Sequence, residues 1–141
     1  MRPWSVLRIA TAVYAVGLAI HTADHLRRGT DVITGEVFWG GMVLTTVSAV
    51  AIALVVARHH GAPLVAAVVG FTAAIGVSAA HLLPHWSALS DSLPDGNVDA
   101  LSWAAVLIEI AGAIAFGVAG LYTLRHVTRA ARPAPASPQL R

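Results

Sequence analysis

Four long apolar stretches dominate this chain of 141 residues. They cover about residues 4–26, 38–58, 63–83 and 101–124. A helix rises about 1.5 Å per residue, so each stretch has the roughly 20 residues that are needed to cross a lipid bilayer. Only 11% of the residues are charged while 57% are hydrophobic, which leaves too little charge to coat a soluble surface. The sequence therefore predicts an all-α integral membrane protein, an up-down bundle of four transmembrane helices.

The chain is expected to form one membrane domain over residues 1–126, followed by a disordered cytoplasmic tail at 127–141, because the end of the chain is rich in Pro, Ala and Ser. The absence of cysteine excludes a disulfide scaffold and removes thiolates from any metal site. All nine basic residues are Arg and none of them forms a continuous basic face, so nucleic acid is not an expected partner. The expected partners are the lipid bilayer and either further copies of the chain or a larger membrane complex.

The distribution of arginine predicts the orientation of the helices. If both termini are cytoplasmic, seven Arg residues lie on the cytoplasmic side and only Arg27 and Arg28 lie outside. The predicted outer loop at 85–100 carries three Asp residues and no Arg. The sequence thus indicates a multi-pass protein of the cell membrane with its N and C termini inside, and the Arg27–Arg28 pair is the one exception to the pattern.

A His-x-x-x-His motif occurs twice, starting at His21 and at His81, at the outer end of the first and third predicted helices. The two copies are 60 residues apart, and each is followed by a loop and by a Trp that opens the next helix, Trp39 or Trp103. This pattern is consistent with two copies of one helical hairpin in the same orientation, related by an axis along the membrane normal.

The ionisable residues of the predicted spans fall into two layers near the outer surface. Glu109 lies six residues below Trp103, or roughly 9 Å at helical rise, and this depth matches that of His21 and His81. A second layer one turn higher contains the residues His25, His85 and Asp24. Because polar groups that face lipid are costly, both layers are expected to point into the bundle.

Imidazole and carboxylate groups without thiolate are ligands that suit Zn, Fe or Cu. In an up-down bundle the first and third helices are diagonal neighbours about 11–14 Å apart, a gap that suits two imidazoles converging on an ion. The sequence therefore predicts a transition-metal site. The candidate ligands are His21, His25, His81, His85, Glu109 and Asp24, and Asp24 can alternatively orient a ligating His through a hydrogen bond.

Three other interpretations stay open at this point. A haem b could take both axial ligands from the diagonal helices, with Arg27 and Arg28 meeting its propionates. The ionisable layer could instead serve as a proton or ion relay, or as a quinol site, in an accessory subunit. In the simplest case it only fixes the register of the helices. No motif names a reaction, so whether the protein is an enzyme is open; metal-activated water or redox chemistry on a lipophilic substrate is the class that such a site would suit.

Overall fold

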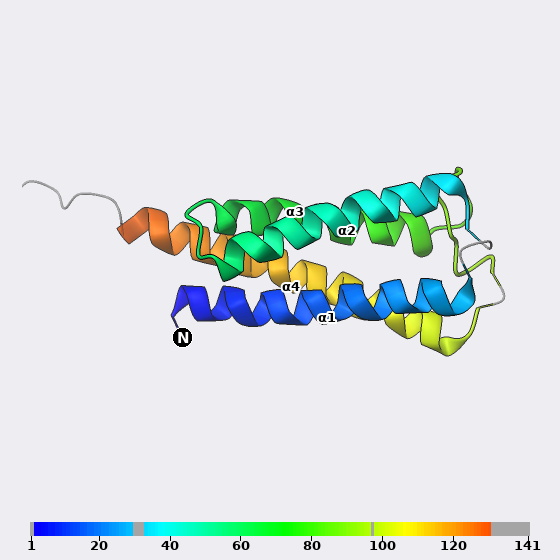
Figure 1. The fold of residues 1–141 in the computed structure, drawn as a ribbon, viewed down its shortest axis with the longest axis horizontal. Helices are drawn as coiled ribbons and strands as arrows, with labels where there is room; N and C mark the ends of the chain where they lie inside the picture. Colours follow the sequence, from blue (N-terminus) through cyan, green and yellow to red (C-terminus); the bar gives the residue numbers. More distant parts are fainter. Residues whose placement is uncertain (1, 30–32, 97, 131–141) are drawn as a thin grey trace, which may run out of the picture.

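The computed structural model describes residues 2–29, 33–96 and 98–130, and these residues form four helices joined into one bundle (Figure 1). The helices are α1 (Pro3–Arg28), α2 (Gly35–Val56), α3 (Ala62–His81) and α4 (Ala100–Ala130). Each is long and apolar enough to span a membrane. The described residues contain no strand. The predicted fold class, an all-α bundle of four transmembrane helices, is confirmed.

The helices run alternately up and down, so that the bundle has two distinct ends (Figure 1). At the loop end, α1 and α3 finish and α2 and α4 begin; at the terminal end, α1 begins and α4 finishes. Helix α4 packs closely against both α1 and α3, whereas α2 packs on α3 and more lightly on α1. The bundle is therefore built around α4.

Local chemistry explains where two of the helices deviate from the predicted spans. Helix α2 begins earlier than expected because Thr34 caps it, its hydroxyl accepting a hydrogen bond of 3.2 Å from the amide of Val37. Helix α3 ends at His81, two residues before the predicted end. Pro84 has no amide hydrogen, and in a continued helix its ring would clash with the carbonyl of Ala80.

Helix α4 is longer than predicted. It continues to Ala130, which includes the first four residues of the segment predicted to be a disordered tail. No Gly or Pro occurs between residues 121 and 130, so nothing in this stretch interrupts a helix. The remainder of the predicted tail, 131–141, lies outside the described residues.

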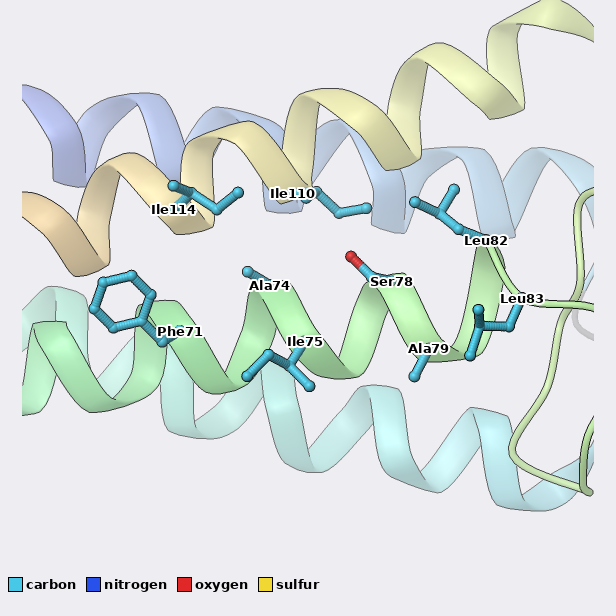
Figure 2. Close-up of a pocket in the computed structure, with 9 residues that line it drawn as sticks. All are labelled: Phe71, Ala74, Ile75, Ser78, Ala79, Leu82, Leu83, Ile110 and Ile114. Atoms are coloured by element: carbon cyan, nitrogen blue, oxygen red, sulfur yellow. The ribbon is translucent and has the colours of Figure 1, made fainter.

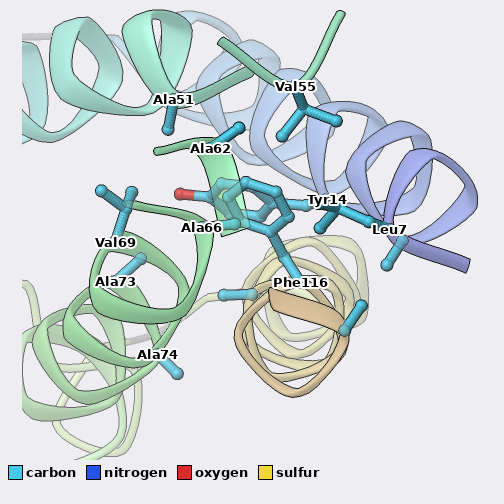
Figure 3. Packing of buried hydrophobic residues seen from close by; sticks show 13 residues of the cluster. Leu7, Tyr14, Ala51, Val55, Ala62, Ala66, Val69, Ala73, Ala74 and Phe116 are labelled. Atoms are coloured by element: carbon cyan, nitrogen blue, oxygen red, sulfur yellow. The ribbon is translucent and has the colours of Figure 1, made fainter. Parts of the chain in front are cut away.

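The apolar core is formed by small residues around one aromatic pair (Figure 3). The rings of Tyr14 on α1 and Phe116 on α4 are stacked, with centroids 5.2 Å apart. The Tyr14 hydroxyl shares a hydrogen bond of 2.7 Å with the hydroxyl of Ser48, which ties α1 to α2. Alanines from α2, α3 and α4 surround the pair, and their short side chains allow the helices to approach closely.

Glycines bring the backbones of α3 and α4 into direct contact. A Cβ atom added to Gly70 would lie 2.5 Å from the amide nitrogen of Gly117. One added to Gly120 would lie 2.6 Å from the amide nitrogen of Ala67. Without a hydrophobic effect between helices in lipid, such close van der Waals contact is a main source of helix association.

The outer surface of the bundle is apolar. Large hydrophobic side chains are exposed on all four helices, and α2 buries only Ser48, Ala51 and Val55. In water such a surface would drive aggregation, whereas in a bilayer it matches the lipid tails. The apolar surface therefore indicates contact with lipid.

The glycine contacts predict an asymmetric response to added methyl groups. Gly70→Ala should destabilise the folded protein by about 1–3 kcal/mol, because the new Cβ meets backbone atoms that cannot rotate away. Gly76→Ala on the same helix is the matched control, since nothing lies within 4 Å of its Cβ position; it should be neutral or stabilising. Thermal unfolding in detergent measures both, and equal effects of the two variants would contradict the packing described.

Candidate metal centre

Three histidines meet inside the loop end of the bundle. His21 and His25 lie one turn apart on α1, and His81 is the last residue of α3. The ring centroids of His21 are 4.7 Å from those of both His25 and His81, and the His25 and His81 centroids are 5.5 Å apart. One ring nitrogen from each residue can be chosen so that the three atoms lie within 4.8 Å of one another. Such a group can hold a metal ion.

Glu109 on α4 reaches the cluster from the bundle interior. Its Oε2 is hydrogen-bonded to Nδ1 of His21, and both side chains are buried. When Glu109 is an ionised carboxylate it can only accept hydrogen bonds, and Nδ1 of His21 is then the donor of this bond. If the ring is neutral, its Nε2 then has a free lone pair, the state that a metal ligand requires.

The position of Glu109 depends on a close approach of α1 and α4. A Cβ atom added to Gly17 would lie only 2.9 Å from the Cα of Glu109. His21 lies one helical turn above Gly17 on the same face of α1. The absence of a side chain at Gly17 therefore places the Glu109 carboxyl within reach of His21.

The loop after α3 folds back over its end and completes the surroundings of His81. The amide of Asp91 donates a 2.9 Å hydrogen bond to the carbonyl of Ala80, and that of Leu93 donates another of 2.9 Å to the carbonyl of His81. These bonds satisfy helix-end carbonyls that have no partner within α3. In return, Nδ1 of His81 donates to the carbonyl of Asp91 at 3.0 Å, which fixes the ring and its tautomer.

The carboxylate of Asp91 is held by Arg28 in a bidentate pair, with distances of 2.9 and 3.0 Å. The Oδ2 atom of Asp91 also lies 3.5 Å from Nδ1 of His81 and 3.9 Å from Nδ1 of His25. Burial raises the pKa of Asp91, but the hydrogen bonds and charge of Arg28 outweigh it, and the pKa is lower than usual. Asp91 is thus a fixed negative charge beside two of the three histidines.

Asp24, a predicted ligand, takes part in a different network. It is buried, and its Oδ1 accepts hydrogen bonds of 3.0 and 2.8 Å from the guanidinium of Arg27. Arg27 also pairs with Asp99, at 3.0 Å, and donates to Ser102 at 3.1 Å. This network joins the end of α1 to the start of α4, and Asp24 does not belong to the three-histidine group.

The expectation that His85 lies one helical turn above His81 is wrong, because α3 ends at His81 and the two residues do not share a helical face. His85 is exposed and lies in the loop, where its amide donates to Asp95. The structure therefore brings His21, His25, His81 and Glu109 together but leaves His85 outside. The proposed hairpin duplication stays a prediction.

Two buried polar atoms at the site have no hydrogen-bond partner among the described residues: Nδ1 of His25 and Oε1 of Glu109. Unpaired polar atoms are costly inside an apolar bundle, and they are uncommon unless a function requires them. Both belong to residues that the sequence singles out as candidate ligands. The site therefore retains unused capacity to bind a cation or a proton.

An apolar surface groove is separate from this site. It is an open groove of about 590 Å³ between α3 and α4, and among its lining residues only Ser78 is polar (Figure 2). None of the three histidines lines it. Its apolar walls match the rest of the lipid-facing surface.

Sequence reasoning missed the roles of Arg28 and Asp91. The sequence did contain a signal: two adjacent arginines on the side of the membrane where arginine is otherwise absent, together with a loop carrying three aspartates. Arginines and aspartates that gather at the same end of a bundle are expected to form ion pairs. The pairing explains the exception to the arginine pattern, because Arg27 and Arg28 are both neutralised locally.

Comparison with known proteins adds no assignment, since no family model, curated protein or solved structure matches this chain.

The network around Asp99 predicts a pH-dependent stability. Asp99 caps α4, its Oδ1 accepting the amide hydrogen of Ser102 at 3.0 Å. That hydrogen bond, together with Arg27, lowers the pKa of Asp99 from its ordinary value. Because its pKa is lowered in the folded state, the Asp99 carboxylate stabilises the fold at pH values above its ordinary pKa of about 4. This stabilisation is lost as the pH falls through the lowered pKa of the folded state.

Asp99→Ala should therefore lower the melting temperature in detergent at pH 7, and the difference from wild type should shrink as the solution is acidified below about pH 4. Asp99→Asn can still accept the Ser102 amide hydrogen, so its melting temperature at pH 7 should lie between those of wild type and Asp99→Ala. A difference that is the same at pH 7 and at low pH would show that the charge of Asp99 is not responsible.

Proposed function

We propose that this chain is a membrane protein that binds one transition-metal ion at the loop end of its bundle, through His21, His25 and His81. The observation that carries the proposal is the convergence of three imidazole nitrogens to within 4.8 Å inside an otherwise apolar bundle. Ionisable residues in a transmembrane bundle are costly, and the proximity of three of them from two helices favours a common ligand over separate structural roles.

The charge of Glu109 supports a bound cation. Its side chain is 1% exposed, and among the described residues its only polar partner is His21. A buried carboxylate without a compensating positive charge is strongly unfavourable. Either a proton or a metal ion beside His21 supplies that charge, and the three-histidine group offers a place for the metal.

The ligand types point to a borderline metal such as Zn, Cu or Fe, because all three ligands are imidazoles and the chain contains no thiolate. A tetrahedral zinc site with bonds of ~2.0–2.1 Å needs ligand nitrogens about 3.3 Å apart. Ion binding would therefore require the three nitrogens to move closer together than their present spacing of up to 4.8 Å. Three protein ligands leave a position free, as in catalytic or exchanging zinc sites and unlike closed structural ones.

The geometry supports a bare ion better than a haem. The rings of His21 and His81 lie with centroids 4.7 Å apart and at an angle of 78°. Axial ligands of a haem instead stand on opposite faces of the macrocycle, which would have to separate these two rings. The third ring, His25, packs against both of the others and occupies the space between α1 and α3.

The arginine distribution would place this site on the outer side of the cell membrane. Helix α1 begins and helix α4 ends at the opposite end of the bundle, and most of the arginines in the sequence fall near that start and that end. In this orientation the metal would exchange with the extracytoplasmic solution, because the loop between α3 and α4 is the nearest aqueous surface. His25, whose side chain is 21% exposed, is the most accessible of the three ligands.

A second function, proton relay, is favoured by a specific observation. Titratable groups follow one another from the interior to the loop in the order Glu109, His21, His81 and Asp91, and the Asp91 carboxylate lies 3.5 Å from Nδ1 of His81. The unpaired Oε1 of Glu109 would accept a further proton at the inner end. In this alternative the histidines exchange protons and hold no metal.

Metal binding is tested by titrating the purified full-length chain with Co²⁺ or Zn²⁺ in detergent. Wild type should bind one ion per chain, and His21→Ala or His81→Ala should abolish binding because each removes one of three ligands. His60→Ala and His85→Ala are the matched controls, since both side chains are exposed and outside the cluster, and they should bind like wild type. Equal effects from all four variants, or no binding by wild type, would reject the metal site.

Glu109→Gln separates a positioning role from a purely structural one. The amide keeps the shape of the side chain but removes its charge, so metal affinity should fall by about 10–100-fold while the protein still folds. Circular dichroism and size exclusion report the fold, and Co²⁺ titration reports the affinity. If the variant fails to assemble even though Glu109→Leu does assemble, polar mispairing rather than a lost metal contact is the cause; unchanged affinity would contradict the role assigned to Glu109.

A further inference from the structure

We propose that Asp91, in the loop between α3 and α4, is a positioning residue of the metal centre that orients His81 and His25. This inference rests on the proposed metal site and adds to it a second carboxylate from outside the transmembrane helices. Glu109 then orients one ligand from the bundle interior, and Asp91 orients the other two from the loop. Arg28 holds Asp91 in place.

Asp91 lies close to the rings of both His81 and His25. Its carbonyl accepts the Nδ1 hydrogen of His81 at 3.0 Å, and its Oδ2 lies 3.5 Å from the same nitrogen. The same Oδ2 is 3.9 Å from Nδ1 of His25, for which the described part of the chain offers no hydrogen-bond partner. A movement of less than about 1 Å would bring this carboxylate into normal hydrogen-bond distance of His25.

Three attachments fix Asp91 at this place. Its amide donates a hydrogen bond of 2.9 Å to the carbonyl of Ala80. Leu93, two residues further along the loop, is buried and donates its amide hydrogen to the carbonyl of His81. The carboxylate is clamped by both terminal nitrogens of Arg28. A bidentate guanidinium–carboxylate pair restricts orientation more than a single contact does, so the negative charge has a defined position relative to the histidines.

The chemistry of metal-bound histidine explains what such a charge does. A ligating imidazole generally donates its second N–H to a carboxylate or a carbonyl, and this bond sets the tautomer and raises the basicity of the ligand. Glu109 fills this role for His21. Asp91 is the only acidic side chain that the described structure places within 4 Å of His25 or His81.

Arg28 keeps the carboxylate from becoming a ligand itself. With Arg28 in place, both oxygens of Asp91 are engaged and the group stays in the outer sphere of the site. Among the described residues, Arg28 forms no hydrogen bond with a histidine of the cluster. We therefore expect Arg28→Gln to disturb the site only through its effect on Asp91.

The test is a Co²⁺ titration of the full-length chain in detergent, followed by the visible absorption spectrum of the bound ion. Asp91→Asn should weaken Co²⁺ binding by about 10–100-fold and change the absorption bands, because the ligand orientation changes. Asp95→Asn is the matched control from the same loop, since Asp95 is exposed and contacts no histidine of the cluster. Its Co²⁺ affinity should stay within about twofold of the wild-type affinity, a smaller change than the loss of an orienting carboxylate produces.

Arg28→Gln gives an independent test if Asp91→Asn does not fold. It should also change the Co²⁺ spectrum and weaken binding, whereas Arg28→Lys, which retains one contact and the charge, should restore part of the affinity. If wild type binds Co²⁺ and both Asp91→Asn and Arg28→Gln bind it equally well with an unaltered spectrum, the role of Asp91 is disproved and the three-histidine site stands. An equal loss in Asp95→Asn would also overturn it, and failure of wild type to bind would overturn both proposals.

Discussion

The site depends on the close approach of α4 to α1 at Gly17. There the Cα of Glu109 occupies the space that a side chain at position 17 would need. His21 lies one helical turn above Gly17, and its ring is hydrogen-bonded to the Glu109 carboxyl. The His21 ring also packs against the rings of the other two histidines. A wider separation of these helices would leave a carboxylate isolated in an apolar interior, which is strongly unfavourable. Tight glycine-mediated packing and a buried ionisable centre are therefore parts of one arrangement.

The polar groups of the bundle are concentrated at the loop end, where they are arranged in two linked networks. One contains the three histidines with Glu109 and Asp91, and the other joins Asp24, Arg27, Asp99 and Ser102. Arg28 connects the first network to the end of α1. The remainder of the bundle is held by small-residue packing and one stacked aromatic pair.

Much of this arrangement follows from the sequence. The length and hydropathy of the four stretches fix the fold class, and the depth of His21, His81 and Glu109 relative to the helix ends predicts that they share a layer. The predicted position of His85 was wrong. Although His81 and His85 have the i, i+4 spacing of a helix, Pro84 prevents α3 from continuing beyond His81. The role of Asp91 could not be read from spacing, since it depends on how a loop of 18 residues folds back onto the end of α3.

Binding of one metal ion by three imidazoles can be measured by X-ray absorption spectroscopy at the zinc edge of the purified, zinc-loaded chain. We expect three imidazole nitrogens at about 2.0–2.1 Å, one further oxygen or nitrogen ligand and no sulfur. The outer-shell scattering of the rings identifies them as histidine, and the His25→Ala variant should lose one ring. A first shell of oxygens alone, without imidazole scattering, would contradict binding by the three imidazoles, and the buried histidines would then be explained better as a proton relay.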